Sequence, residues 1–257
     1  MFASRRLAAV GLVLTLAAAF PGVAAANHSW GGYHWARQSN PFTLKLGDNV
    51  TSTWDSYLAQ ASSDWSRSTV LDTTVVPGSA NPRTCKATLG MVQVCNASYG
   101  NNGWLGIAGI SITGGTHITK AYVKLNDYYF NKSQYNTPSW RQLVTCQEVA
   151  HTFGLDHQDT NFNNANLGTC MDYTSDPDGP PSNTGPNQHD YDELVTIYTH
   201  LDSSTTVGAA LPKGSAAAAA EGAGWGREVA RTHGGHTSVF VRDLGRGNLV
   251  VTYVIWA

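Results

Sequence analysis

The stretch Cys146-Gln-Glu-Val-Ala-His-Thr-Phe-Gly-Leu-Asp-His157 carries more information about the fold than any other part of the chain. Gln147 and His151 are four residues apart, so on a helix their side chains leave the same face and can converge on one ion. Gly154 has no side chain and accepts a positive backbone φ angle, which lets the chain leave the helix. A turn there returns His157 towards the other two side chains. The spacing therefore predicts a helix ending near Gly154 and three potential metal ligands.

Glu148 adds a base to this group of ligands. A catalytic zinc takes three protein ligands and keeps one position open for water. The carboxylate of Glu148 can take a proton from that water. An isolated Glu-x-x-His on a helix is more often a solvated surface pair. Gly154 and His157, at their distances from Glu148, favour the metal site.

A second short segment, Cys170-Met-Asp-Tyr173, follows soon after His157. With the pattern H-E-x-x-H-x-x-G-x-x-H, in which Gln147 replaces the first histidine, it makes the sequence resemble the metzincin metalloproteases, most closely matrixin-like secreted bacterial members. The resemblance covers roughly residues 30 to 201. It implies an α/β (α+β) catalytic domain with a twisted mixed sheet, an active-site helix and a methionine-containing turn. Met171 would form the hydrophobic floor of the site.

The resemblance also implies an activity and a role for each site residue. The protein would be a secreted zinc-dependent metalloendopeptidase that hydrolyses peptide bonds with a metal-activated water. Gln147, His151 and His157 would bind Zn²⁺, and Glu148 would be the general base. Tyr173 would ligate the metal or stabilise the developing oxyanion, the alternative being a half-buried tyrosine bonded to backbone.

The expected substrate is a protein or peptide in an extended conformation. In matrixin-like folds a strand such as Ile118–Asn126 forms the edge of the sheet above the cleft. An extended peptide can add to such an edge as a further strand. We therefore expect substrate to lie between this segment and the turn at Met171.

Gln147 leaves two interpretations of the chemistry open. Its amide oxygen can ligate zinc, although this neutral, harder donor binds more weakly than imidazole. Alternatively the chain is a catalytically impaired homologue that acts as a peptide- or protein-binding module. A third class, a carbohydrate-associated structural protein, is suggested only by the aromatic and Asn-rich composition. Glu148 favours the enzyme, because an inactive site has no chemical use for a base there.

A few further residues are candidates to complete the metal site. Cys146 precedes Gln147 by one residue, while His117 and His189 lie near the expected edge strand and the last helix. We expect surface or capping roles for both histidines. The H-x-D…H…H set that holds the structural zinc of animal matrixins is not visible in the sequence, and neither is a clear EF-hand calcium loop.

The four cysteines indicate two disulfides in an exported chain. Three pairings are possible. Cys85 and Cys95 flank a turn and strand, so we pair them with each other. Cys146 and Cys170 then join the helix to the methionine turn. The competing interpretation is that Cys146 ligates the metal.

The first 26 residues have the features of a signal peptide. Arg5 and Arg6 precede an apolar run from Leu7 to Phe20, and small residues at 24–26 offer a cleavage site. The run is too short and wrongly flanked for a membrane span. Charged residues make up 13% of the chain and the net charge is −2, which argues against nucleic acid as a partner. We expect a secreted, extracellular monomer.

The remaining chain divides by composition into three parts. Residues 27–202 form the expected metallopeptidase domain, and 203–222 are an Ala/Gly/Ser-rich linker. Residues 223–257 form a C-terminal β-hairpin extension, with strands at 238–244 and 249–256 joined by Gly245-Arg-Gly-Asn248. A hairpin is barely stable alone, so it should dock on another surface.

Periodicity predicts the elements of the main domain. Apolar alternation indicates strands, and apolar stripes at helical spacing indicate helices. The expected strands are 41–46, 71–76, 103–112 and 118–126, and the expected helices run up to residue 65 after a cap at Asp48 or Thr51, over 141–153 and over 187–200.

Overall fold

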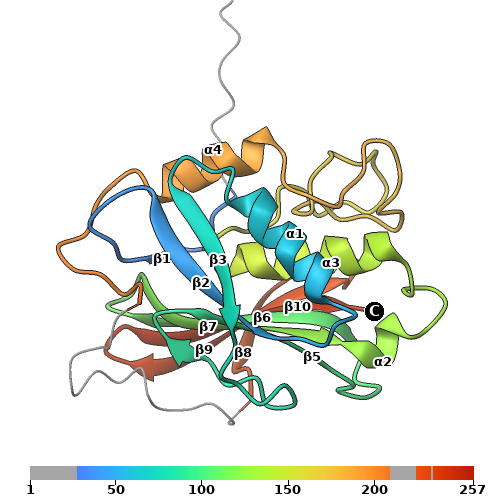
Figure 1. Ribbon diagram of the computed structural model, residues 1–257, viewed down its shortest axis with the longest axis horizontal. Helices are drawn as coiled ribbons and strands as arrows, with labels where there is room; N and C mark the ends of the chain where they lie inside the picture. The colour runs from blue at the N-terminus through green and yellow to red at the C-terminus, as the bar shows by residue number, and fades with distance from the viewer. Residues whose placement is uncertain (1–27, 209–223, 233) are drawn as a thin grey trace, which may run out of the picture.

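A single mixed β-sheet with helices over one face forms the body of the molecule (Figure 1). The structure is a computed structural model that describes residues 28–208, 224–232 and 234–257. The expected signal peptide and most of the expected linker lie outside the described residues. The α/β class predicted from the sequence is confirmed.

The sheet has the strand order β3-β2-β5-β7-β6-β10-β9-β8, with β1 and β4 pairing additionally with β7. Strands β3, β2, β5 and β7 run parallel, and every pair from β7 to β8 is antiparallel. The strands are β1 (His34–Trp35), β2 (Phe42–Asn49), β3 (Leu71–Pro77), β4 (Thr88–Leu89), β5 (Val92–Ala97), β6 (Trp104–Thr113), β7 (His117–Asn126), β8 (Arg227–Arg231), β9 (Thr237–Gly245) and β10 (Asn248–Trp256).

Within the described residues the helices are α1 (Asp55–Trp65), α2 (Asp127–Phe130), α3 (Pro138–His151) and α4 (Gln188–Ile197). Helices α1 and α3 lie side by side over the sheet in Figure 1. The sequence placed these two helices correctly to within a few residues, but the predicted cap of α1 was wrong. Its N-cap residue is Trp54 and makes no side-chain cap hydrogen bond.

The core lies between the sheet and helices α1 and α3. Along β2, Phe42, Leu44 and Leu46 are buried while the residues between them are exposed, as the alternation predicted. Strand β6 is buried on both faces over most of its length. The helices cover one face of β6, and aromatic side chains, among them Trp225, Phe240 and Trp256, pack against Ile107 on the other face.

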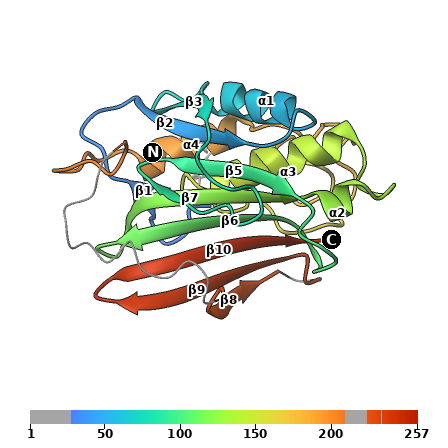
Figure 2. The same ribbon diagram turned by 60° about the horizontal axis from the view of Figure 1, so that its bottom comes forward.

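The expected edge strand is the one topological prediction that was wrong. Strand β7 lies between β5 and β6, so residues 118–126 are in the interior of the sheet. The antiparallel strand β6 lies one position further out. Its outer side is not free either, because β10 pairs with it from Leu249↔Ile112 to Trp256↔Trp104. Figure 2 shows β7, β6, β10, β9 and β8 following one another across the sheet.

The C-terminal hairpin predicted from residues 238–256 is present as β9 and β10. It is continuous with the main sheet, and β8 adds a third strand that the sequence did not predict. Val251, Tyr253 and Ile255 alternate along β10 and belong to the main hydrophobic core. The surface against which the hairpin packs is therefore the outer edge of β6.

Both expected disulfides form. Cys85 pairs with Cys95, and Cys146 pairs with Cys170. The second bond joins α3 to the segment that carries Met171. It excludes Cys146 as a metal ligand, because a disulfide sulfur carries no thiolate.

The end of α3 is fixed from several directions. The helix begins at Thr137, whose side chain accepts a hydrogen bond from the Trp140 amide. At the other end, Trp35 Nε1 donates to the Thr152 carbonyl at 2.8 Å. Tyr198 Oη donates to the Phe153 carbonyl at 2.9 Å. These bonds satisfy carbonyl groups that a helix end leaves without partners.

Gly154 ends the helix with a φ angle of 94°. A Cβ atom at this position would lie 1.9 Å from the Tyr33 carbonyl oxygen. Both the backbone angle and the close approach of Tyr33 therefore require glycine. None of the helices in the described ranges has the length and hydropathy of a membrane span.

We predict that Gly154→Ala lowers the free energy of unfolding by more than about 3 kcal/mol, because left-handed strain adds to a backbone clash. Gly208→Ala is the matched control. Gly208 has a φ of 65° but no atom within 4 Å of an added Cβ, so only the strain of about 1 kcal/mol applies. Urea unfolding measures both. Equal losses would contradict the role given to the Tyr33 contact.

Candidate active site

His151 and His157 face each other through the same ring nitrogen. Their Nε2 atoms are 3.2 Å apart. Nδ1 of His151 lies 2.8 Å from the Leu155 carbonyl oxygen, which can only accept, so this nitrogen carries the proton. Nδ1 of His157 lies 3.2 Å from the Asp156 carboxylate and likewise donates. With one proton on each ring, held at Nδ1, each ring presents an Nε2 lone pair to the other.

Two lone pairs at this distance repel unless they share a cation. Ligand atoms about 3.3 Å apart are what a tetrahedral zinc requires at its usual zinc–nitrogen distance. The Nδ1 hydrogen bonds to Leu155 and Asp156 are the outer contacts that fix metal-binding histidines in one tautomer. The pair thus has the geometry of two metal ligands.

Burial keeps the His151 ring neutral. It lowers the pKa of His151 to about 3, with a further contribution from the neighbouring His157. Burial alone would raise the pKa of Asp156, but its hydrogen bonds with the ring and the amide of His157 outweigh this and lower it. The Asp156 carboxylate is therefore ionised and available to orient the His157 ring.

Gln147, the unusual member of the motif, is buried on α3. Its Nε2 donates to the Cys170 carbonyl at 3.0 Å, which fixes the orientation of the amide. Its Oε1 is buried and has no hydrogen-bond partner within the described parts of the chain. An unsatisfied buried oxygen costs free energy that a cation can recover. The Gln147 oxygen is therefore buried without a protein hydrogen-bond partner in these parts of the chain, while the amide nitrogen is held by Cys170.

Glu148 lies on the sheet side of α3. Its side chain reaches Gly106 of β6, where an added Cβ would come within 2.7 Å of Glu148 Oε1. Burial raises the pKa of this carboxyl well above its ordinary value. Oε2 is buried and finds no partner among residues 28–208, 224–232 and 234–257. One oxygen of the Glu148 carboxyl group is thus left without a hydrogen-bond partner in these ranges.

Met171 is completely buried in the main core. Its amide donates to Thr169 Oγ1 at 3.0 Å, and its carbonyl accepts from the Gln158 amide at 2.7 Å. The second bond links the methionine turn directly to the residue after His157. The turn therefore supports the segment that carries the third predicted ligand.

Tyr173 lies on the outer side of His157. Its hydroxyl is 3.0 Å from His157 Nδ1 and also bonds to Thr237 Oγ1. Burial raises its pKa well above the ordinary value. In this arrangement the hydroxyl contacts the nitrogen that faces away from His151, so it orients the ring from behind.

Sequence reasoning did not predict that the C-terminal strands would reach this site. The ring of Tyr253 stacks on His151, with centroids 4.3 Å apart and planes within 3°. Thr237 of β9 contacts Tyr173 as described above. The only signal was the alternation of Val251, Tyr253 and Ile255, which predicts a buried face but not the surface that it covers.

A cavity of about 400 Å³ lies beside the site. Gln147 and Leu143 of α3 form part of its wall, and Tyr173 and Thr174 form another part. The C-terminal strand closes the cavity with Ile255 and its following residues. The space could take a substrate side chain, and it is bordered by the unusual glutamine.

The other histidines considered from the sequence have different partners. His117 lies 3.1 Å from Asp202. The ring of His189 stacks on His28 at 4.9 Å. These contacts do not bring His117 or His189 to His151 as a further metal ligand.

No protein-family model and no curated protein matches this chain. Similar solved structures include myroilysin, at 11% identity and a TM-score of 0.35, covering 64% of this chain and 96% of that one. A second myroilysin crystal structure has 11% identity and a TM-score of 0.34, with 70% and 98% covered. High choriolytic enzyme 1, a hatching-enzyme zinc protease of the medaka fish Oryzias latipes, has 10% identity and a TM-score of 0.36, with 65% and 94% covered. Similarity at this level does not assign the chain to a family.

We predict that Gly106→Ala destabilises the protein by about 1–3 kcal/mol, because the new methyl group crowds Glu148 and Val144. Gly185→Ala is the control, since its nearest neighbour would be 3.4 Å away. A double-mutant cycle with Glu148→Ala should show a smaller loss than the sum of the two single changes. Strict additivity in urea unfolding would contradict the proposed contact.

Proposed function

We propose that the protein is a secreted zinc-dependent metalloendopeptidase. The observation that carries this proposal is the pair of Nε2 lone pairs of His151 and His157, 3.2 Å apart, with both Nδ1 atoms engaged elsewhere. Gln147 Oε1 would be the third ligand. Matrixin-like membership of the metzincins is part of the proposal.

The donor set fits zinc. Two imidazole nitrogens and one oxygen are ligands that zinc accepts, and three protein ligands are the number found in catalytic sites. The bound ion would polarise a peptide carbonyl and acidify a water molecule. The weaker amide ligand would lower the affinity for the metal without changing this chemistry.

The chain's own residues would transfer the proton and hold the ligand side chains in place. Glu148 would accept a proton from the attacking water through its unpartnered oxygen and pass it to the leaving amine. Asp156 and Tyr173 would hold the His157 ring in its ligand orientation through Nδ1. Cys170 would hold the Gln147 amide through its carbonyl group.

Export is supported by the disulfides and by the N-terminal sequence. Two disulfides are typical of oxidising compartments. The charged and apolar pattern of residues 1–26 is that of a signal peptide. We therefore place the activity outside the cell.

The second candidate function is a peptide- or protein-binding module with an impaired site. It is favoured by the substitution at Gln147 and by the pairing of β10 along β6. The retained base Glu148 favours the enzyme.

The test is zinc content and peptidase activity of the secreted protein. We expect zinc in the parent chain and cleavage of an unfolded protein substrate. Glu148→Gln should lower the cleavage rate by about two to four orders of magnitude, because the proton acceptor is lost. It should retain zinc, which serves as the control for folding and metal binding.

Gln147→His separates the two functions. If the parent is an enzyme, the histidine should tighten zinc binding by roughly tenfold or more, since imidazole is the stronger donor. Should zinc and proteolysis occur only in Gln147→His and never in the parent, the enzyme proposal for the natural protein fails.

A further inference from the structure

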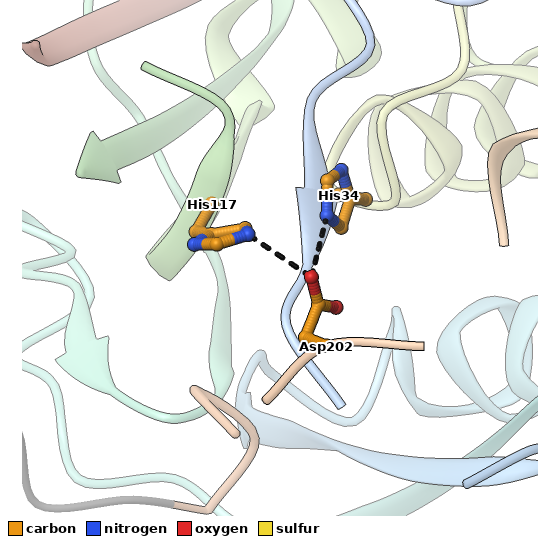
Figure 3. Close-up of side chains that lie close together, drawn as sticks. All are labelled: His34, His117 and Asp202. Carbon is orange, nitrogen blue, oxygen red and sulfur yellow. Dashed lines mark hydrogen bonds and ion pairs between the residues drawn. The ribbon is translucent and has the colours of Figure 1, made fainter. Parts of the chain in front are cut away.

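A second group of potential metal ligands lies away from the candidate active site. His34 of β1, His117 of β7 and Asp202 point towards one another (Figure 3). His200 joins them, because its Nε2 is 3.1 Å from His34 Nε2. The four residues come from the N-terminal part, the middle and the end of the main domain.

The separations between Asp202 Oδ1 and the three histidine nitrogens, and between His34 and His200, are close to those of a tetrahedral site. The Oδ1 atom of Asp202 is 3.1 Å from His117 Nε2 and 3.5 Å from His34 Nε2. It is 3.7 Å from His200 Nε2. Adjacent ligands of a four-coordinate zinc lie about 3.3 Å apart. The ligand atoms of His34, His117 and Asp202 all lie within 4.8 Å of one another, so the side chains would draw together around a bound ion.

The surrounding structure fixes two of these ligands. Nδ1 of His34 donates to the Gly32 carbonyl at 2.8 Å, so its Nε2 carries the lone pair. The other oxygen of Asp202 accepts from the Arg37 amide at 3.1 Å and from Arg37 Nη1 at 3.0 Å. Asp202 therefore presents Oδ1 to the histidines and Oδ2 to the arginine, as outer contacts of metal ligands commonly do.

The sheet brings the first two histidines together. Strand β1 pairs with β7 in parallel, and His34 is opposite His117 in this register. His34 is buried, while the side chain of His200 is 52% exposed, which leaves a route for an ion from solvent. The site would thus be filled after folding without opening the core.

We propose that His34, His117, His200 and Asp202 form a structural zinc site. Three imidazoles and one carboxylate complete a tetrahedral sphere and leave no open position, which distinguishes structural from catalytic zinc. The ion would fasten β1 and β7 to the segment that follows α4. This proposal does not depend on the proposed peptidase activity.

Only His200 and Asp202 are close in the sequence, as a His-x-Asp pair. Sequence reasoning missed the site because the other two ligands, His34 and His117, lie far from this pair along the chain. The competing arrangement is a hydrogen-bonded cluster in which His200 donates to His34 and His117 donates to Asp202. Both arrangements use the contacts above, so metal binding must be measured directly.

The experiment is zinc titration of the metal-free full-length protein, with bound zinc counted after gel filtration. The variants are His200→Gln, His117→Gln and His157→Gln, with exposed His236→Gln as the matched control. His200→Gln is the least disturbing to the fold because of its exposure. We also measure the melting temperature with and without zinc.

We expect His200→Gln and His117→Gln each to lose one zinc equivalent, while His236→Gln binds as the parent does. Zinc should raise the melting temperature of His157→Gln by roughly 5 °C or more, because it binds only the folded state. If His200→Gln and His117→Gln bind as much zinc as the parent, the cluster is only hydrogen-bonded and the proposal is overturned. Loss of a zinc equivalent in His157→Gln, with no loss in the other variants, would report on the candidate active site and not on this cluster.

An independent observation concerns access to the active site. Strand β10 pairs with β6 from residue 249 to residue 256. This outer side of β6 is adjacent to Glu148 at Gly106. An extended peptide could bind a free edge at this position by strand addition. In this structure the chain's own C-terminal strand takes that place.

The side chains of β10 also cover the predicted ligands. Tyr253 stacks on His151, and Ile255 lines the cavity beside Gln147. The hydroxyl of Tyr253 is buried, and no hydrogen-bond partner for it occurs in the described portion of the chain. An unsatisfied buried hydroxyl weakens the packing of this ring relative to phenylalanine. The side chains of β10 therefore cover the predicted ligands, but the buried Tyr253 hydroxyl makes this packing less favourable.

We infer that the C-terminal strands β8–β10 keep the candidate active site closed, which rests on the proposed function. Displacing them would expose the β6 edge and the His151 ring together. A peptide or protein substrate would then occupy the position of β10.

The test uses the full-length chain with a cleavage sequence for a specific protease placed between Gly208 and Gly224. Tyr253→Ala weakens the cover after cleavage, and Val254→Ala, on the opposite face of β10, is the matched control. The readouts are proteolysis and the fluorescence anisotropy of a labelled extended peptide. Circular dichroism checks that each cut protein remains folded.

We expect cut Tyr253→Ala to bind the peptide roughly tenfold more tightly than the uncut parent, since affinity scales with the open fraction. Adding the free segment 224–257 should reverse the gain. Tighter binding without hydrolysis would support closure and count against the peptidase. No gain in binding, or an equal gain in cut Val254→Ala, would overturn the closure.

Discussion

The return of the chain at Gly154 is the constraint on which the candidate active site depends. Without a positive φ angle there, and without room for the Tyr33 carbonyl, the segment after α3 could not bring His157 Nε2 to 3.2 Å from His151 Nε2. The hydrogen bonds on both Nδ1 atoms then determine which nitrogens face each other. A potential metal site therefore follows from one backbone conformation and two acceptor oxygens.

The C-terminal strands give the main sheet a different outer edge from the one expected. Strand β6 is buried on both faces, so its outer row of backbone groups needs a partner. β10 supplies that partner within the same chain and places Tyr253 over His151. The same pairing stabilises the sheet and covers the site, so stability and access are coupled through one strand.

The sheet also connects the two histidine clusters. Strand β1 contributes His34 to the second cluster, and the neighbouring Trp35 donates to the Thr152 carbonyl at the end of α3. An ion bound by His34 would therefore act one residue away from a contact that holds the active-site helix. The second cluster is placed to stabilise the frame of the first without taking part in its chemistry.

The sequence by itself determined the local features: α3, the turn at Gly154, both disulfide pairs and the β9–β10 hairpin. Each depends on spacing, glycine or alternation within a short stretch, where geometry follows from covalent structure. Only the tertiary structure decided that β7 is interior, that β10 occupies the edge of β6 and that Asp202 meets His34, His117 and His200. These depend on which distant surfaces pack together, and no short-range pattern records that choice because many pairings satisfy the same alternation.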